Sequence, residues 1–237
     1  MKLNSFSSVS TVLTPNGSVN FYAAEGVDKK FRENICETLQ KLSIFSPSVQ
    51  NALTNLENII ILKDSASYIP ENFSATKTKL NQYASDAYGF VSKPDSAIVI
   101  NEQNHQRKDV LLEGNVQTQA SDTLSHEIGH LIDKEYSKSQ SFQQAYLQDL
   151  KDIEEKLNKN RQVKSRDLKE MLVYLKHYME GVDFSDGIDE KDITKEGLRE
   201  NFAECFSTIV DENPSEINDI FVSLFPHTMK QTLDFVI

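Results

Sequence analysis

Apolar residues along this chain follow two spacings, and the change from one to the other separates an early mixed region from a later helical one. Residues 29–42 place apolar side chains three or four positions apart, which predicts an amphipathic helix, and 47–56 predicts a second, shorter helix. Short β-branched runs at 58–62 and 97–100 predict buried strands. The early region therefore combines predicted helices with predicted strands.

A turn signal and two long apolar stripes extend this prediction. The Pro-Asp pair at 94–95 favours a hairpin over about 88–101. From Ser121 onward the spacing is helical, and two stripes contain Phe142, Tyr146, Leu150, Ile153 and Leu157, and then Leu168, Leu172, Leu175 and Met179. This order of elements predicts an α+β fold in which a small N-terminal sheet precedes a mainly helical half.

The chain contains no internal repeat and no Pro- or Gly-rich linker that would force a division into domains. We expect residues 1–20, which are rich in Ser, Thr and Asn, to be a flexible segment. Residues 21–237 are then expected to form one domain, with an α/β lobe over 21–120 and a helical lobe over 121–237.

Composition argues against several classes of partner. With 38% hydrophobic and 26% charged residues, the chain has the composition of a globular protein. A net charge of −11 without a basic stripe argues against nucleic acid binding, and no segment has the apolar length of a membrane span. Cys36 and Cys205 form no CxxC pair, so we expect two buried, reduced thiols.

The N-terminal residues bear on export. Residues 1–18 contain one Lys but no apolar core, so we expect no Sec signal peptide. Their composition suits either an export signal for direct injection into another cell or a frayed terminus.

The strongest chemical signal is the pentapeptide His-Glu-Ile-Gly-His at 126–130. In a helix, His126 and His130 project from one face a single turn apart, so one metal ion can reach both. The opposite side of this helix is apolar and carries Leu124, Ile128, Leu131 and Ile132. The helix can therefore bury one face and present both histidines to a cleft.

Glu127 is the candidate general base. A zinc ion with three protein ligands keeps one position open, lowers the pKa of a water there to about 7 and polarises the scissile carbonyl. Glu127 follows the first histidine and is displaced around the helix, which suits contact with that water rather than with the metal. It would take the proton of the water and return it to the leaving amine. The alternative is a solvated helix with two surface histidines.

A third ligand must come from elsewhere in the chain. A metzincin would place Gly and His three and six residues after His130, where this chain has Asp133 and Tyr136. We expect Asp133, one turn beyond His130, to orient a ligand imidazole. Glu200 and Glu204 share one face of a predicted helix and could serve as metal ligand and as support for the ligands. Alternatively, they are two solvated carboxylates on a surface helix.

Together, the motifs at 126–133 and 200–206 resemble the catalytic domain of anthrax lethal factor and the related clostridial Pro-Pro endopeptidases. Ser139–Phe142, Pro226–Thr228 and the hairpin before the motif helix are also similar. The resemblance covers about 85–237, whereas the N-terminal third matches only in the order of its elements.

The resemblance implies a zincin-like fold of the gluzincin type that binds one Zn²⁺ per chain. The implied zinc ligands are His126, His130 and Glu200, and the implied general base is Glu127. Glu204 is implied to help hold the zinc ligands in position. It also implies a protein or peptide substrate that lies in extended form along an edge strand over the cleft. We assign this edge to the predicted strand at Ala97, Ile98, Val99 and Ile100, whose backbone would hydrogen-bond the substrate.

The chain departs from the family pattern in two places. His130 and Glu200 lie 70 residues apart, and the surplus is an inserted helical stretch at about 157–190. The family also has an oxyanion-stabilising Tyr seven residues before the ligand Glu, where this chain has Ile193. Tyr178 is our candidate replacement, ahead of Tyr174 and His177, although all three also suit plain helix packing.

We therefore expect a zinc endopeptidase that is a secreted bacterial toxin or an effector delivered into a host cytosol, with the bacterial cytoplasm as the alternative location. Two other functions stay open. One is a catalytically weak or idle relative that uses the same fold as a binding module, which the Ile at 193 favours, and the other is a metal-dependent hydrolase of a non-peptide amide.

Overall fold

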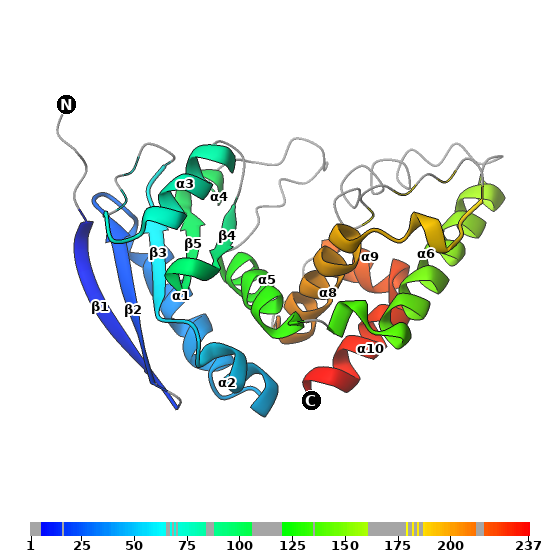
Figure 1. Ribbon diagram of the computed structural model, residues 1–237, viewed down its shortest axis with the longest axis horizontal. Helices are drawn as coiled ribbons and strands as arrows, with labels where there is room; N and C mark the ends of the chain where they lie inside the picture. The colour runs from blue at the N-terminus through cyan, green and yellow to red at the C-terminus, as the bar shows by residue number, and fades with distance from the viewer. Residues whose placement is uncertain are drawn as a thin grey trace. The chain divides into compact units, whose positions relative to one another are not determined.

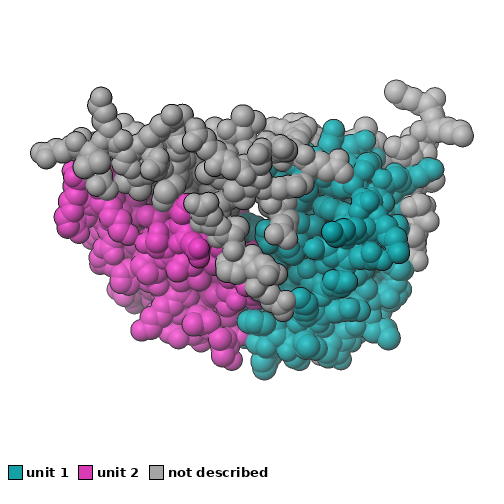
Figure 2. All heavy atoms as spheres, turned by 180° about the vertical axis from the view of Figure 1, so that it is seen from behind, with its two compact units in different colours: residues 1–110, 114–132 teal, residues 111–113, 133–237 magenta. Residues whose placement is uncertain are grey.

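The computed structural model of the chain, drawn in Figure 1, describes residues 6–15, 17–64, 67, 69, 71–83, 88–105, 120–134, 136–160, 179, 182, 184, 187–211 and 216–237. Two compact units are coloured separately in Figure 2. Unit 1 holds the described residues up to Ile132, and unit 2 holds those from Asp133 onward.

The described part of unit 1 is built on a mixed sheet of five strands (Figure 1). The strands are β1 (Phe6–Thr14), β2 (Gly17–Ala24), β3 (Asn58–Leu62), β4 (Gly89–Ser92) and β5 (Ala97–Asn101). They lie in the order β1-β2-β3-β5-β4, with β2, β3 and β5 parallel and an antiparallel strand at each edge. The strands predicted at 58–62 and 97–100 and the predicted hairpin over 88–101 are thereby confirmed.

Helices cover both faces of this sheet. They are α1 (Lys29–Leu42), α2 (Pro47–Leu53), α3 (Ser74–Tyr83), α4 (Glu102–His105) and α5 (Ala120–Asp133), with a 3₁₀ turn η1 (Lys93–Asp95). Leu62 belongs to an apolar cluster that includes Leu80 of α3, whereas its neighbour Ile61 lines a cavity against α1. Successive residues of a strand face opposite sides of the sheet, so α1 and α3 cover opposite faces. Both faces of β3 are therefore buried, which explains its unbroken apolar run.

The predicted helices of unit 1 form where local signals place them. At the start of α1, Asp28 Oδ1 accepts the backbone N–H of Phe31 at 3.0 Å, and the helix buries Ile35 and Leu39 completely. The boundaries of α1 confirm the prediction over 29–42. By contrast, α2 ends at Leu53, three residues earlier than the prediction over 47–56.

The expectation of a flexible segment over 1–20 is wrong for the residues that the structure describes there. Strands β1 and β2 form an antiparallel hairpin in which Val12 lies opposite Val19, and both side chains are buried. An edge strand needs apolar residues only on the face that it buries, so the polar residues of β1 are compatible with a strand. The high content of Ser, Thr and Asn in this segment therefore did not reveal that its apolar residues lie on one face of a strand.

The prediction that the strand at Ala97–Asn101 is the substrate edge is also wrong. β5 pairs with β3 on one side and with β4 on the other, so both sides of its backbone are occupied. The edge strand of this hairpin is β4. A Pro-Asp turn marks a hairpin but does not determine which of its strands joins the rest of the sheet.

Unit 2 is helical in its described part. Its elements are η2 (Tyr136–Lys138), α6 (Gln140–Asn160), η4 (Glu190–Asp192), α8 (Lys195–Val210), α9 (Glu216–Leu224) and α10 (Pro226–Val236). Its fully buried aromatic side chains are Phe142, Tyr146, Phe202, Phe206, Phe221 and Phe225. The first predicted stripe is buried from Phe142 to Ile153, while Leu157 is half-buried; of the second stripe, only Met179 is described, and it is buried. The chain is therefore α+β, as expected.

Among the described helices, none is long and apolar enough to cross a membrane.

One buried carboxylate organises the start of α10. Asp149 of α6 is fully buried and accepts the backbone N–H groups of His227 and Thr228 at 3.0 and 2.9 Å, together with the Thr228 hydroxyl at 2.9 Å. Burial raises the pKa of Asp149 to about 6, and these hydrogen bonds partly oppose the shift. Asp149 thus caps α10 from a different helix.

Candidate metal and catalytic site

The two histidines of the motif share one face of α5, as predicted. The rings of His126 and His130 meet edge to face, with their centroids 4.8 Å apart and their planes at 89°. Both side chains are half-buried. The i, i+4 spacing and the helical conformation together bring the two imidazoles side by side.

The opposite face of α5 buries its apolar residues. Leu124 and Ile128 are fully buried, Ile132 is 3% exposed, and Leu131 is half-buried. This packing confirms the predicted division of the helix into an apolar face and a histidine face. Because this apolar face is buried, the histidines cannot rotate into its place without exposing several large side chains.

Glu127 lies against the edge strand β4. Its side chain is only 7% exposed. A Cβ built on Gly89 of β4 would lie 3.5 Å from Glu127 Cγ, 2.7 Å from Thr123 Cγ2 and 2.9 Å from the Val99 carbonyl oxygen. Any side chain at 89 would therefore force α5 or β4 to move. Gly89 was not among the predicted site residues, although an isolated Gly in a predicted strand is a signal of close backbone approach.

The backbone of Gly89 faces away from β5, on the side of β4 where the described part of the sheet has no further strand. Tyr88 O accepts the Asn101 N–H at 2.9 Å, so residue 88 directs its backbone toward β5. In an antiparallel ladder this direction alternates, so Gly89 and Val91 direct their N–H and C=O groups outward. The Val91 carbonyl accepts a hydrogen bond from Lys79 Nζ at 2.6 Å. Gly89 thus combines outward backbone groups with a Cβ position that lies 3.5 Å from Glu127 Cγ.

The downstream carboxylates Glu200 and Glu204 lie on α8 in unit 2. Both are half-buried and one turn apart, while Phe202 and Phe206 of the same helix are fully buried. This arrangement confirms the predicted apolar side of the helix. Among the residues that the structure describes, His126, His130 and Glu200 form a group that could hold a metal ion, with one ligand atom from each.

Asp133 has a different role from the one expected. Its carboxylate accepts the backbone N–H of Ser137 at 2.7 Å and the Ser137 hydroxyl at 2.8 Å, one bond to each oxygen. Asp133 is 4% exposed. The hydrogen bonds that Asp133 makes among the described residues are these two, so the prediction that it orients a ligand imidazole finds no support here.

The position of the expected oxyanion-stabilising Tyr is occupied by Ile193, which ends η4 and is half-buried. Tyr178, Tyr174 and His177 lie outside the described residues. Tyr136 is described, but its hydroxyl donates to the Gln231 carbonyl at 3.1 Å within unit 2.

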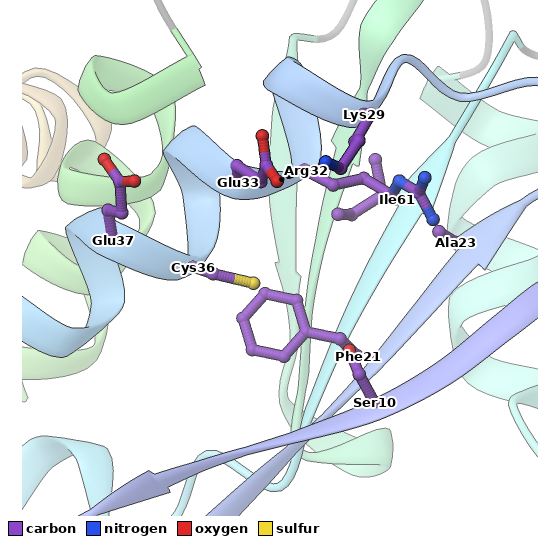
Figure 3. A pocket seen from close by; sticks show the side chains of 9 residues that line it. All are labelled: Ser10, Phe21, Ala23, Lys29, Arg32, Glu33, Cys36, Glu37 and Ile61. Carbon is purple, nitrogen blue, oxygen red and sulfur yellow. Dashed lines mark ion pairs between the residues drawn. The ribbon is translucent and has the colours of Figure 1, made fainter.

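A separate cavity of about 330 Å³ lies in unit 1 between α1 and the sheet, as Figure 3 shows. Its apolar floor includes Phe21 and Ile61, and Cys36 of α1 points toward the Phe21 ring. α5 contributes none of its lining residues. Burial raises the pKa of the Cys36 thiol, so at neutral pH the group is a protonated thiol and a poor nucleophile.

Both cysteines are free, as expected, although Cys36 is half-buried rather than buried. Cys205 is completely buried, and burial raises its pKa as well. Neither thiol therefore competes with the histidine motif as a catalytic group.

No known protein-family model matches the chain, and neither does any protein in a search of curated sequences.

Proposed function

We propose that this chain is a zinc-dependent endopeptidase of the gluzincin type with a zincin-like fold. In this proposal His126, His130 and Glu200 bind one zinc ion, and Glu204 supports the ligand group. The observation that carries the proposal is the edge-to-face pair of His126 and His130, with the largely buried Glu127 between them in the helix. Two imidazole nitrogens and one carboxylate oxygen form a ligand set typical of catalytic zinc.

Glu127 acts as the general base. When bound, zinc supplies Lewis acidity that polarises the scissile carbonyl and makes water a nucleophile near neutral pH. Glu127 takes a proton from the attacking water and delivers it to the amine of the departing peptide. Its position between the edge strand and the histidine face restricts the carboxylate to few orientations, which favours a defined path for the proton.

The substrate adds to the sheet at β4 rather than at β5. An extended peptide hydrogen-bonds to the outward N–H and C=O groups of Gly89, beside Glu127. The bond from Lys79 to the Val91 carbonyl limits this pairing to the Gly89 end of the strand. Recognition through backbone groups makes a protein or peptide the natural substrate, and we retain the secreted toxin or injected effector as its setting.

A second candidate is a peptide-binding module without turnover. The observation that favours it is Ile193 at the position where the related peptidases have a Tyr, since Ile cannot donate a hydrogen bond to an oxyanion. Zinc binding is expected in both cases, and peptide cleavage only in the first.

Metal content and peptide cleavage of matched variants test the proposal. We expect purified wild type, prepared without chelators, to carry about one zinc per chain, the stoichiometry of a single catalytic site. His126→Ala should lose the zinc. His227→Ala is the matched control, because His227 is half-exposed and pairs with Asp152 in unit 2.

Glu127→Gln separates the two candidate functions. It should retain zinc while cleavage of a peptide library falls by about 10²–10⁴-fold, the usual contribution of a general base. Absence of zinc from wild type would exclude both candidates. Zinc without any cleavage, in wild type as well as in Glu127→Gln, would leave the binding module as the function.

A further inference from the structure

His105 is a buried side chain that connects the sheet to the helix of the histidine motif. It ends α4, directly after β5, and is only 3% exposed. Its Nδ1 lies 2.7 Å from the carbonyl oxygen of Asn101, and its Nε2 lies 2.9 Å from the hydroxyl oxygen of Thr123 on α5. Both ring nitrogens therefore bind defined partners, one on each element.

The chemistry of these partners fixes the direction of both hydrogen bonds. A carbonyl oxygen can only accept, so Nδ1 of His105 carries a proton. Burial lowers the pKa of His105 and so favours the neutral ring. In a neutral ring protonated at Nδ1, Nε2 has a lone pair and accepts the Thr123 hydroxyl. Thr123 is thus the donor to His105.

Aromatic neighbours hold the plane of the imidazole. Phe31 of α1 and Tyr88, just before β4, both meet His105 edge to face, with ring centroids 5.2 Å away in each case. The planes are inclined at 66° and 78°. Such contacts favour one orientation of a ring, so the acceptor lone pair of His105 points in a fixed direction.

Thr123 is restrained on two sides. Its hydroxyl binds His105, while its methyl carbon Cγ2 would lie only 2.7 Å from a Cβ at Gly89. Thr123 is 6% exposed and lies one helical turn before Glu127. Because both the hydroxyl and the methyl group of Thr123 are held, α5 is restricted in its rotation about its own axis and in its distance from β4. The same rotation and distance determine where the Glu127 carboxylate lies.

We propose that His105 is a positioning residue for Glu127, which it orients through Thr123. The inference rests on the proposed function, because it assigns the contact to proton transfer by Glu127. Displacement of a reacting group by about 1 Å can reduce the rate on the order of 100-fold. A hydrogen bond that fixes the rotation of α5 therefore acts on turnover more than on substrate binding.

Thr123→Val is the direct test, because it replaces the hydroxyl by a methyl group and retains the shape of the side chain. We expect kcat for peptide cleavage to fall by about 10- to 100-fold, with KM changed less than twofold and zinc content unchanged. Thr76→Val is the matched control: Thr76 is completely buried in unit 1, and its hydroxyl has no partner among the described residues. That control should keep kcat within a factor of two.

Two substitutions of His105 test the acceptor itself. His105→Asn keeps a donor near the Asn101 carbonyl but is too short to reach Thr123, so it should lower kcat as Thr123→Val does. His105→Gln offers a carbonyl oxygen to Thr123 and should recover a substantial part of the loss. A structural role alone would make both variants equally harmful, because both remove the ring that packs on Phe31.

The outcomes separate this inference from the proposed function. ¹⁵N NMR of wild type should show His105 in the Nδ1-protonated neutral form, and the other tautomer would overturn the inference without any activity measurement. If wild type cleaves peptides and Thr123→Val matches Thr76→Val in kcat, the positioning role is wrong while the peptidase stands. If wild type binds zinc but cleaves nothing, the proposed function fails, and the role of His105 in catalysis fails with it.

Discussion

Glu127 Cγ lies 3.5 Å from the position that a Cβ on Gly89 would occupy. This closeness places the candidate base next to β4, which is an edge strand of the described sheet. The same Gly presents its backbone outward, so the groups that would hold a peptide and the carboxylate that would act on it come from adjacent positions of two elements. Each of these elements belongs to unit 1.

Gly89→Ala should disturb this arrangement. The new methyl group would lie 2.9 Å from the Val99 carbonyl and 2.7 Å from Thr123 Cγ2, so α5 or β4 must move. We expect a loss of about 1–3 kcal/mol in the free energy of unfolding, measured by urea titration, and a fall in kcat/KM.

A second substitution provides the control for Gly89→Ala. Adding Thr123→Ser removes the methyl group in the way and should recover part of the stability, whereas the clash with Val99 persists. Unaltered stability and activity in Gly89→Ala would contradict the close approach of α5 to the strand.

Glu200 and Glu204 should differ in their effect on zinc affinity. Glu200→Gln removes the proposed third ligand, whereas Glu204→Gln alters only a supporting carboxylate, which typically costs about 10- to 100-fold in affinity. We expect the larger loss for Glu200→Gln, measured by competition with a chromogenic chelator. Equal losses, or a larger one for Glu204→Gln, would reverse the two assignments.

Asp133→Ala should lower stability and leave zinc affinity unchanged. It removes two hydrogen bonds to Ser137, just beyond the end of α5, and a hydrogen bond of this kind typically contributes about 0.5–1.5 kcal/mol. Thermal unfolding of the zinc-free protein measures the effect, with Ser137→Ala as a milder comparison because it removes one of the two bonds. Loss of a residue that orients a zinc ligand typically lowers zinc affinity by about 10-fold or more. A fall of that size in Asp133→Ala would show that Asp133 orients His130.

Asp149 should make stability depend on pH between about 4 and 6. Its pKa is raised to about 6 in the folded chain from the ordinary value of 3.8, so the unfolded state ionises first as pH rises. The contribution of Asp149 is therefore complete below pH 3.8. It is lost as pH rises through about 6, and the free energy of unfolding falls by up to about 3 kcal/mol.

The measurement is the difference in unfolding free energy between wild type and Asp149→Asn, followed by urea titration from pH 4 to pH 7. Asn has nearly the same shape but does not titrate, so the difference isolates the carboxyl group. A difference that does not vary over this range would show that burial and the three hydrogen bonds cancel at Asp149.

Local patterns were sufficient for much of the fold and for the centre of the site. The helix over 29–42, the buried strand over 58–62 and the hairpin near 88–101 follow from periodicity and turn residues. The shared face of His126 and His130 follows from helical geometry alone. Each of these features depends on residues that lie close together in the sequence, within about two helical turns or the length of one strand. Such short-range geometry is determined by the sequence itself.

Tertiary structure alone decided which strand is the edge and which side chains meet α5. The edge position of β4 and the contact between His105 and Thr123 both depend on packing between segments that are separated in the sequence. Asp133 illustrates the same limit at short range, since its helical position suited His130 and its actual partner is Ser137. The sequence by itself thus determined the local elements and the histidine pair. The order of the strands and the partners of α5 were determined by which distant segments pair with the same strand edges and polar atoms.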